Sequence, residues 1–139
     1  MKMYIILFFI LLSFVGCKDE GNTFETRSIK GKWEVISIIE NEIIIPKEFP
    51  NDSIVIDFQD DDKIFGNSLR NLITGSYKLY ENDSIWISSI GGTEINETIW
   101  EKKFKEIMPK VSFFDLQEAN TLVLLTSNSK SRITLKTAK

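Results

Sequence analysis

From Gly31 to the C-terminus, apolar and polar residues alternate in short runs that are separated by polar turns. Trp33 and Val35, for example, are flanked by residues of the opposite face, and the segment 54–58 repeats the pattern with Ile54, Ile56 and Phe58. A period of two puts successive side chains on opposite faces, which is typical of β-strands with one buried face. The sequence therefore predicts a fold built mainly from antiparallel strands.

The same alternation predicts further strands at 63–66, 75–80, 84–88, 111–116, 121–125 and 132–136. Asn82 and Asp83 lie between two of these runs and favour a hairpin turn. The short apolar run 43–45 is stopped by Pro46, so we expect an edge strand or a loop there. These runs amount to about eight strands.

One segment, 96–108, breaks the alternation. Its large apolar side chains recur at the spacing of one helix face, namely Trp100, Phe104, Ile107 and Met108. Glu101 and Lys105 form a favourable pair four residues apart. Thr93 or Asn96 can cap the start of this helix by accepting hydrogen bonds from free N–H groups.

These elements predict a mainly β fold of the α+β kind. Several short antiparallel strands need a closed or covered arrangement to protect their edges. We therefore expect a small antiparallel β-barrel or sheet of about eight strands, with one amphipathic helix packed on it. A chain of this length is about one domain and buries about two-thirds of its unfolded surface.

The N-terminus indicates export. A lysine near the start is followed by an apolar stretch, 4–15, that is shorter than the roughly 20 residues a membrane span needs. Gly16 and Cys17 follow, so the segment reads as a signal peptide rather than an uncleaved membrane anchor, and its end resembles the lipobox of bacterial lipoproteins. The expected organisation is a signal peptide at 1–16, a lipidated cysteine with its tether at 17–29, and a domain at 30–139.

The lipobox resemblance implies a diacylglyceryl thioether on the Cys17 sulfur and an acyl group on its amine. Two or more acyl chains hold a protein stably on a membrane. The expected partner is therefore a membrane, which the protein contacts through the lipid on Cys17. The sequence does not identify a protein partner. Because Cys17 is the single cysteine, an internal disulfide is excluded.

The residues directly after Cys17 carry a second signal. Lys18, Asp19 and Glu20 resemble the lysine-and-acid export signal of Bacteroidota lipoproteins. That resemblance implies an outer-membrane lipoprotein displayed on the cell surface. A location on the periplasmic face is the alternative, with the triplet acting as an ordinary solvated linker.

The residue types present give little support for catalysis. The chain has no histidine, which excludes Ser-His-Asp catalysis and histidine-containing zinc sites. The acidic residues Asp57 and 60–62 lack the spacing of an EF-hand calcium loop. Without Lys2 the net charge falls from −3 to −4, which argues against nucleic-acid binding. We expect no enzyme activity, cofactor or metal.

Several motifs occur in the order of a known family. Gly31 to Glu34 resembles an opening G-x-W motif, Asn71 to Tyr77 fits N-x-x-x-G-x-Y, and Glu101 to Phe104 fits E-x-x-F. In this order the chain resembles the META domain, the family that includes the bacterial heat-shock protein HslJ. The motif residues, expected to be structural, are Trp33, Gly66, Asn71, Gly75, Tyr77, Thr93, Glu101 and Phe104. The chain reads Leu69-Arg70-Asn71 where the family usually has G-C-N.

Within the motif we expect Trp33, Tyr77 and Phe104 to anchor the core. Gly66 and Gly75 should supply backbone freedom at bends or bulges. Asn71 should cap a loop rather than bind a ligand.

The resemblance implies a non-catalytic module for interaction or envelope maintenance. The alternative is a lipocalin-like barrel that binds a small apolar ligand, since such domains also open with G-x-W. Its candidate lining residues are Trp33, Phe58, Phe65, Tyr77 and Trp86. Trp86 is out of phase with its neighbours, so it and Tyr80 could instead form an exposed partner surface.

Overall fold

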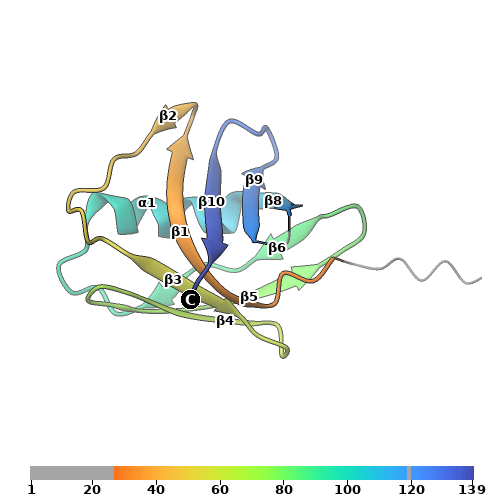
Figure 1. Ribbon diagram of the computed structural model, residues 1–139, viewed down its shortest axis with the longest axis horizontal. Helices are drawn as coiled ribbons and strands as arrows, with labels where there is room; N and C mark the ends of the chain where they lie inside the picture. The colour runs from red at the N-terminus through yellow and green to blue at the C-terminus, as the bar shows by residue number, and fades with distance from the viewer. Residues whose placement is uncertain (1–26, 119) are drawn as a thin grey trace, which may run out of the picture.

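The computed structural model describes residues 27–118 and 120–139, which form ten strands and one α-helix. The strands are β1 (Gly31–Glu40), β2 (Ile43–Ile44), β3 (Ile54–Phe58), β4 (Lys63–Ser68), β5 (Leu72–Leu79), β6 (Ile85–Ile87), β7 (Gly91–Gly92), β8 (Val111–Gln117), β9 (Thr121–Thr126) and β10 (Arg132–Thr137). The helix α1 spans Ile99–Ile107 and continues into a 3-10 turn at Met108–Lys110. Figure 1 shows the strands curling around the core, with α1 across the sheet behind β1 and β10.

The strands are all antiparallel and follow the order β6-β5-β4-β3-β1-β10-β9-β8. The two short strands lie off this path, with β2 beside β1 and β7 beside β5. A bridge between Ser84 and Phe113 joins the two ends, supported by the Phe114 N–H donating to the Asp83 carbonyl at 2.9 Å. The sheet is thus a nearly closed barrel, and the predicted fold class is confirmed.

The first strand serves both halves of the barrel. Its start pairs with β3 and most of its length pairs with β10. The register shifts between Val35 and Ser37, so one extra residue is inserted and Ile36 turns toward solvent. The shift lets Trp33, Val35 and Ile38 all face the core, although their spacing does not follow a strict period of two.

The helix confirms the predicted apolar stripe, because Trp100, Phe104, Ile107 and Met108 are all buried. The predicted cap was wrong: Thr98 is the N-cap, and its hydroxyl accepts from the Glu101 N–H at 3.2 Å. Thr93 is engaged with β5, and the helix begins later than we expected. In the described part of the chain, α1 and its 3-10 turn are too short to cross a bilayer.

The barrel interior is filled by large side chains. The rings of Phe58 and Tyr77 meet edge to face with their centroids 4.9 Å apart, and the Tyr77 hydroxyl donates to the Gln59 carbonyl at 2.8 Å. The indole N–H of Trp33 donates to the Ile29 carbonyl at 2.7 Å. Ile29, which the sequence placed at the end of the tether, is fully buried in the core. The packed domain therefore begins one residue earlier than predicted.

The two motif glycines supply space rather than backbone freedom. Gly66 lies in an unbroken ladder between β3 and β5 and does not have a positive φ. A Cβ there would lie 2.3 Å from the Val55 carbonyl oxygen. At Gly75 a Cβ would lie 2.9 Å from Cδ1 of Ile90. Both glycines thus permit close packing, which corrects the expectation of bends or bulges.

Candidate functional site

A buried polar network lies where β5, β7 and α1 meet, and Asn71 is at its centre. The Asn71 amide nitrogen donates to the Ile95 carbonyl at 3.1 Å and to Glu101 Oε2 at 3.2 Å. Its oxygen accepts from the Ile95 N–H at 2.6 Å and from the Thr93 hydroxyl at 3.0 Å. A primary amide offers two donors and two acceptor positions, so Asn71 is fully satisfied.

Thr93 connects this network to the edge of the barrel. Its hydroxyl accepts from the Leu72 N–H at 2.9 Å while it donates to Asn71. The preceding Gly92 has a φ of 134°, and a Cβ at that position would lie 1.8 Å from the Leu72 carbonyl oxygen. Only glycine fits this close approach of β7 to β5.

A cation and two carboxylates extend the network along the helix. Lys105 donates to Glu97 and to the Thr93 carbonyl, the latter at 3.3 Å. Its Nζ is also 3.9 Å from Glu101 Oε1, so the predicted pair of Glu101 and Lys105 is confirmed. All three charged side chains are largely buried. Glu101 is in the first turn of α1, where the helix dipole favours a negative charge.

A small pocket opens beside the network, between the loop before β3 and the start of α1. Its lining includes Asp52, Ser68, Arg70, Thr98, Trp100 and Glu101. The pocket volume is about 10 Å³, close to the least that one water molecule requires. Among the described residues, Glu101 Oε1 and Trp100 Nε1 are buried without a hydrogen-bond partner.

The hydrogen bonds of this network can hold a loop and a helix in place. The volume of the adjacent pocket is far below that of ligand pockets, which measure about 300–1,000 Å³. In the described part of the chain, no group of three or more carboxylate, cysteine or histidine side chains is placed to hold a metal ion. The chemistry of the network is therefore that of internal hydrogen bonding.

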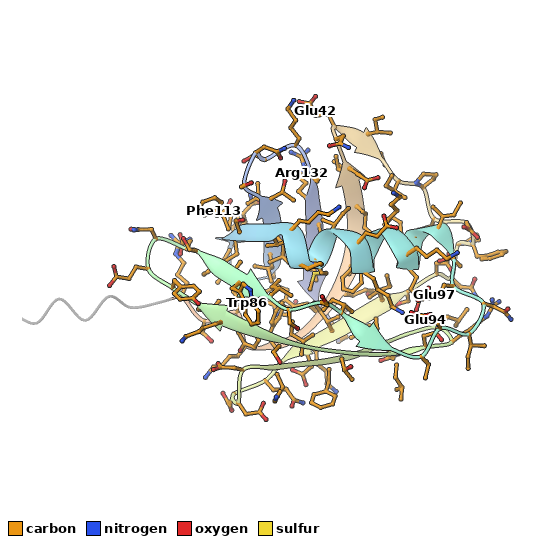
Figure 2. All side chains as sticks on the ribbon, turned by 180° about the vertical axis from the view of Figure 1, so that it is seen from behind. Glu42, Trp86, Glu94, Glu97, Phe113 and Arg132 are labelled. Atoms are coloured by element: carbon orange, nitrogen blue, oxygen red, sulfur yellow. The ribbon has the colours of Figure 1, made fainter. Side chains whose placement is uncertain are left out.

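A second candidate is a group of exposed aromatic side chains, which we call the aromatic face: Tyr80, Trp86 and Phe113, together with Lys78. Their exposed fractions are 49% for Tyr80, 52% for Trp86 and 42% for Phe113. Lys78 pairs with Trp86 across the strands, and its Nζ lies 5.7 Å from the centre of the Tyr80 ring. Figure 2 shows Trp86 and Phe113 on the half of the molecule where the chain enters.

The META domain family matches residues 23–139. The chain belongs to the META family. A comparison with curated protein sequences gives no match. The sequence-based resemblance to this family is thus confirmed over the whole folded domain.

Two solved structures share the fold of this META protein. One is the crystal structure of a DUF4847 family protein from Bacteroides vulgatus, with a TM-score of 0.59, 18% identity, and coverage of 84% of this chain and 96% of that chain. The other is the NMR structure of a protein from Burkholderia xenovorans, with a TM-score of 0.60, 14% identity, and coverage of 79% and 83% respectively. At these identities the likeness concerns the fold alone.

The family motif residues divide into two groups in space. Trp33, Tyr77 and Phe104 are core anchors, as predicted. Asn71, Thr93 and Glu101, far apart in the sequence, meet in the polar network. Asn71 does hold a loop, as expected, and it also binds the helix. Glu97 also joins this group through Lys105, and no motif or periodicity in the sequence predicted this.

The predicted lipidation and export residues are Cys17, Lys18, Asp19 and Glu20, and they lie outside the described residues. The first described residue, Arg27, is near the end of β8, since its guanidinium donates to the Leu116 carbonyl at 3.5 Å. Any tether from Cys17 therefore reaches the domain on this side of the barrel.

Proposed function

We propose that this META protein is a lipid-anchored, non-catalytic lipoprotein of the outer membrane that serves in protein interaction or envelope maintenance. The non-catalytic part of this proposal is supported by the contacts that the polar residues of the family motif make. Asn71, Thr93 and Glu101 bind one another and the adjacent backbone, so the motif maintains the fold. The anchor is supported by the signal-like sequence that ends at Cys17.

The residue chemistry also supports a non-catalytic role. A general acid or base must reach the proton that it transfers. The Glu101 carboxylate is almost completely buried beside a pocket with room for about one water molecule. With no histidine in the sequence, it also lacks the commonest proton-transfer partner.

The lipocalin-like alternative receives less support from the packing. Of its five candidate lining residues, Phe65 and Trp86 point to solvent, while Trp33, Phe58 and Tyr77 fill the interior. The larger pockets, of 300 to 480 Å³, are open surface grooves, such as the one beside Asp60 and Asp61. A ligand barrel needs an enclosed apolar space of several hundred Å³.

The location we propose is the outer face of the outer membrane, because Lys18, Asp19 and Glu20 follow the lipidated cysteine. The periplasmic face is the alternative. The two locations differ in whether a protease added to intact cells reaches the domain.

Labelled palmitate and protease treatment of intact cells together test this proposal. We expect the protein to carry label and to be digested, Cys17→Ser to lose the label, and the triple variant K18A/D19A/E20A to keep the label but resist digestion. An unlabelled wild-type protein would contradict the anchor. A labelled wild-type protein that resists protease would contradict surface display alone.

A further inference from the structure

We infer that the aromatic face rests against the interfacial region of the bilayer that holds the lipid anchor, which gives the domain a fixed orientation on the membrane. This inference rests on the proposed function, since it takes Cys17 as the anchor. Three features of the molecule support it: the place where the chain enters the domain, the reach of the tether, and the chemistry of the exposed side chains.

The chain enters the domain beside the aromatic face. Ser28 lines the same surface groove as Lys78 and Leu79, at the end of β5. Lys78 in turn pairs with Trp86 and lies over the Tyr80 ring. Strand β8, which carries Phe113, ends near Arg27. The entry point and the aromatic face are thus parts of one continuous surface.

The length of the tether limits which parts of the domain lie close to the bilayer. Nine residues lie between Cys17 and Arg27, and the ten residue-to-residue steps that join them span at most about 35 Å. That length is comparable with the diameter of a domain of about 100 residues. Glu94 and Glu97 mark the opposite end of the molecule in Figure 2. That end can approach the bilayer only if the tether extends along the whole domain.

The side chains of the aromatic face suit a membrane interface. Trp and Tyr are enriched at the level of lipid headgroups, because their rings are apolar with one polar group. Lys78 can extend its charged group to the headgroups while its stem stays beside the rings. Acidic residues, Glu81 and Asp115, lie close by on exposed positions. Because the local charge is mixed, we expect binding to zwitterionic lipid as well as to anionic lipid.

The three tryptophans make this orientation measurable. Trp33 and Trp100 are buried, with exposed fractions of 3% and 2%, whereas Trp86 is exposed. The test uses the lipidated protein in phosphatidylcholine vesicles, with acyl chains either unmodified or brominated near the headgroup. We expect brominated lipid to quench the Trp86 emission and the vesicle to shield it from acrylamide.

Two variants provide controls. Trp86→Phe should lose the lipid-quenched emission. The double variant W86F/F49W moves the reporter to the segment between β2 and β3, on an exposed residue away from the chain entry. Figure 1 shows this segment on the side of the domain opposite the start of the coloured ribbon. In this double variant, acrylamide should quench the emission of the relocated reporter, and brominated lipid should leave it unchanged.

Flotation of the same vesicles reports the anchor separately. Protein that floats while Trp86 remains in water overturns the orientation but leaves the anchor intact. A third outcome is shielding from acrylamide that increases with the protein-to-lipid ratio, without quenching by brominated lipid. This outcome indicates that Trp86 contacts a second copy of the protein, and it also overturns the orientation. Protein that fails to float overturns the proposed anchor, and this inference with it.

Discussion

The amide nitrogen of Asn71 and Oε2 of Glu101 lie 3.2 Å apart, and this contact connects the start of β5 to the first turn of α1. The two residues are 30 positions apart in the sequence. Around them, Thr93 and the backbone of Ile95 complete the hydrogen bonds of the Asn71 amide. The helix is thus held to the barrel by polar contacts as well as by its apolar stripe.

Replacing Asn71 by alanine should destabilise the protein by about 3 kcal/mol, because several buried partners lose their hydrogen bonds at once. The measurement is urea unfolding followed by circular dichroism. Asn67→Ala is the matched control, since Asn67 is an exposed residue of β4, and we expect it to change stability by less than about 0.5 kcal/mol. Equal effects of the two substitutions would contradict the central role of Asn71.

Lys105→Met should cost about 3 kcal/mol, because it leaves the largely buried Glu97 and Glu101 carboxylates without their cation. Lys103→Met, on the same helix, is the comparison. Lys103 pairs with Glu40 at 2.9 Å in a more exposed setting, so its loss should cost less than about 1 kcal/mol. A larger loss of unfolding free energy in Lys103→Met than in Lys105→Met would show that burial does not decide the strength of these pairs.

Gly66→Ala should cost about 3 kcal/mol, because the added Cβ would lie 2.3 Å from the Val55 carbonyl oxygen, inside a backbone ladder. Gly91→Ala tests the same chemical change in open surroundings. There the nearest atom is the Thr74 hydroxyl oxygen at 3.5 Å, so stability should change by less than about 1 kcal/mol. Thermal unfolding of both variants checks this, and a neutral Gly66→Ala would contradict the steric argument.

Burial raises the pKa of Tyr77 above its usual value, with Asp62 adding to the shift and Lys30 opposing it. In the unfolded chain the phenol ionises near pH 10. Just above that pH the unfolded state loses a proton that the folded state keeps. The contribution of Tyr77 to stability is therefore complete below about pH 10 and is lost as the pH rises through the folded pKa.

Urea unfolding of the wild type and Tyr77→Phe measures this effect. The variant lacks the hydrogen bond to Gln59, so at about pH 9 it should be about 1 kcal/mol less stable. Above about pH 10 the difference should shrink, since only the wild type carries the ionisable phenol. A difference that stays constant across this range would contradict the pKa argument.

Most of the fold could be predicted from the sequence, because binary patterning reports directly on which face of an element is buried. Strand β3 has the predicted bounds, and the apolar stripe of α1 is buried as expected. The hairpin turn at Asn82 and Asp83 was also predictable, and both residues adopt a positive φ. Such local signals do not depend on distant partners.

The errors concern residues whose role depends on distant contacts. Thr93 was a reasonable helix cap by composition, but its hydroxyl is engaged by Asn71 and the Leu72 backbone. The space required at Gly66 arises from the neighbouring strand and cannot be read from β4 alone. The polar network joins three segments, so periodicity within any one of them gives no sign of it.

The bridge between Ser84 and Phe113 closes the barrel at a single point, whereas β9 and β10 are joined along a full ladder. Among the contacts between neighbouring strands around the barrel, the seam between β6 and β8 should therefore have the lowest free energy of local opening, and its amides should exchange with solvent before those of the ladders. Opening there would separate β6 from β8 at the part of the hairpin beyond the β4–β5 ladder, while β1, β10 and α1 keep their positions.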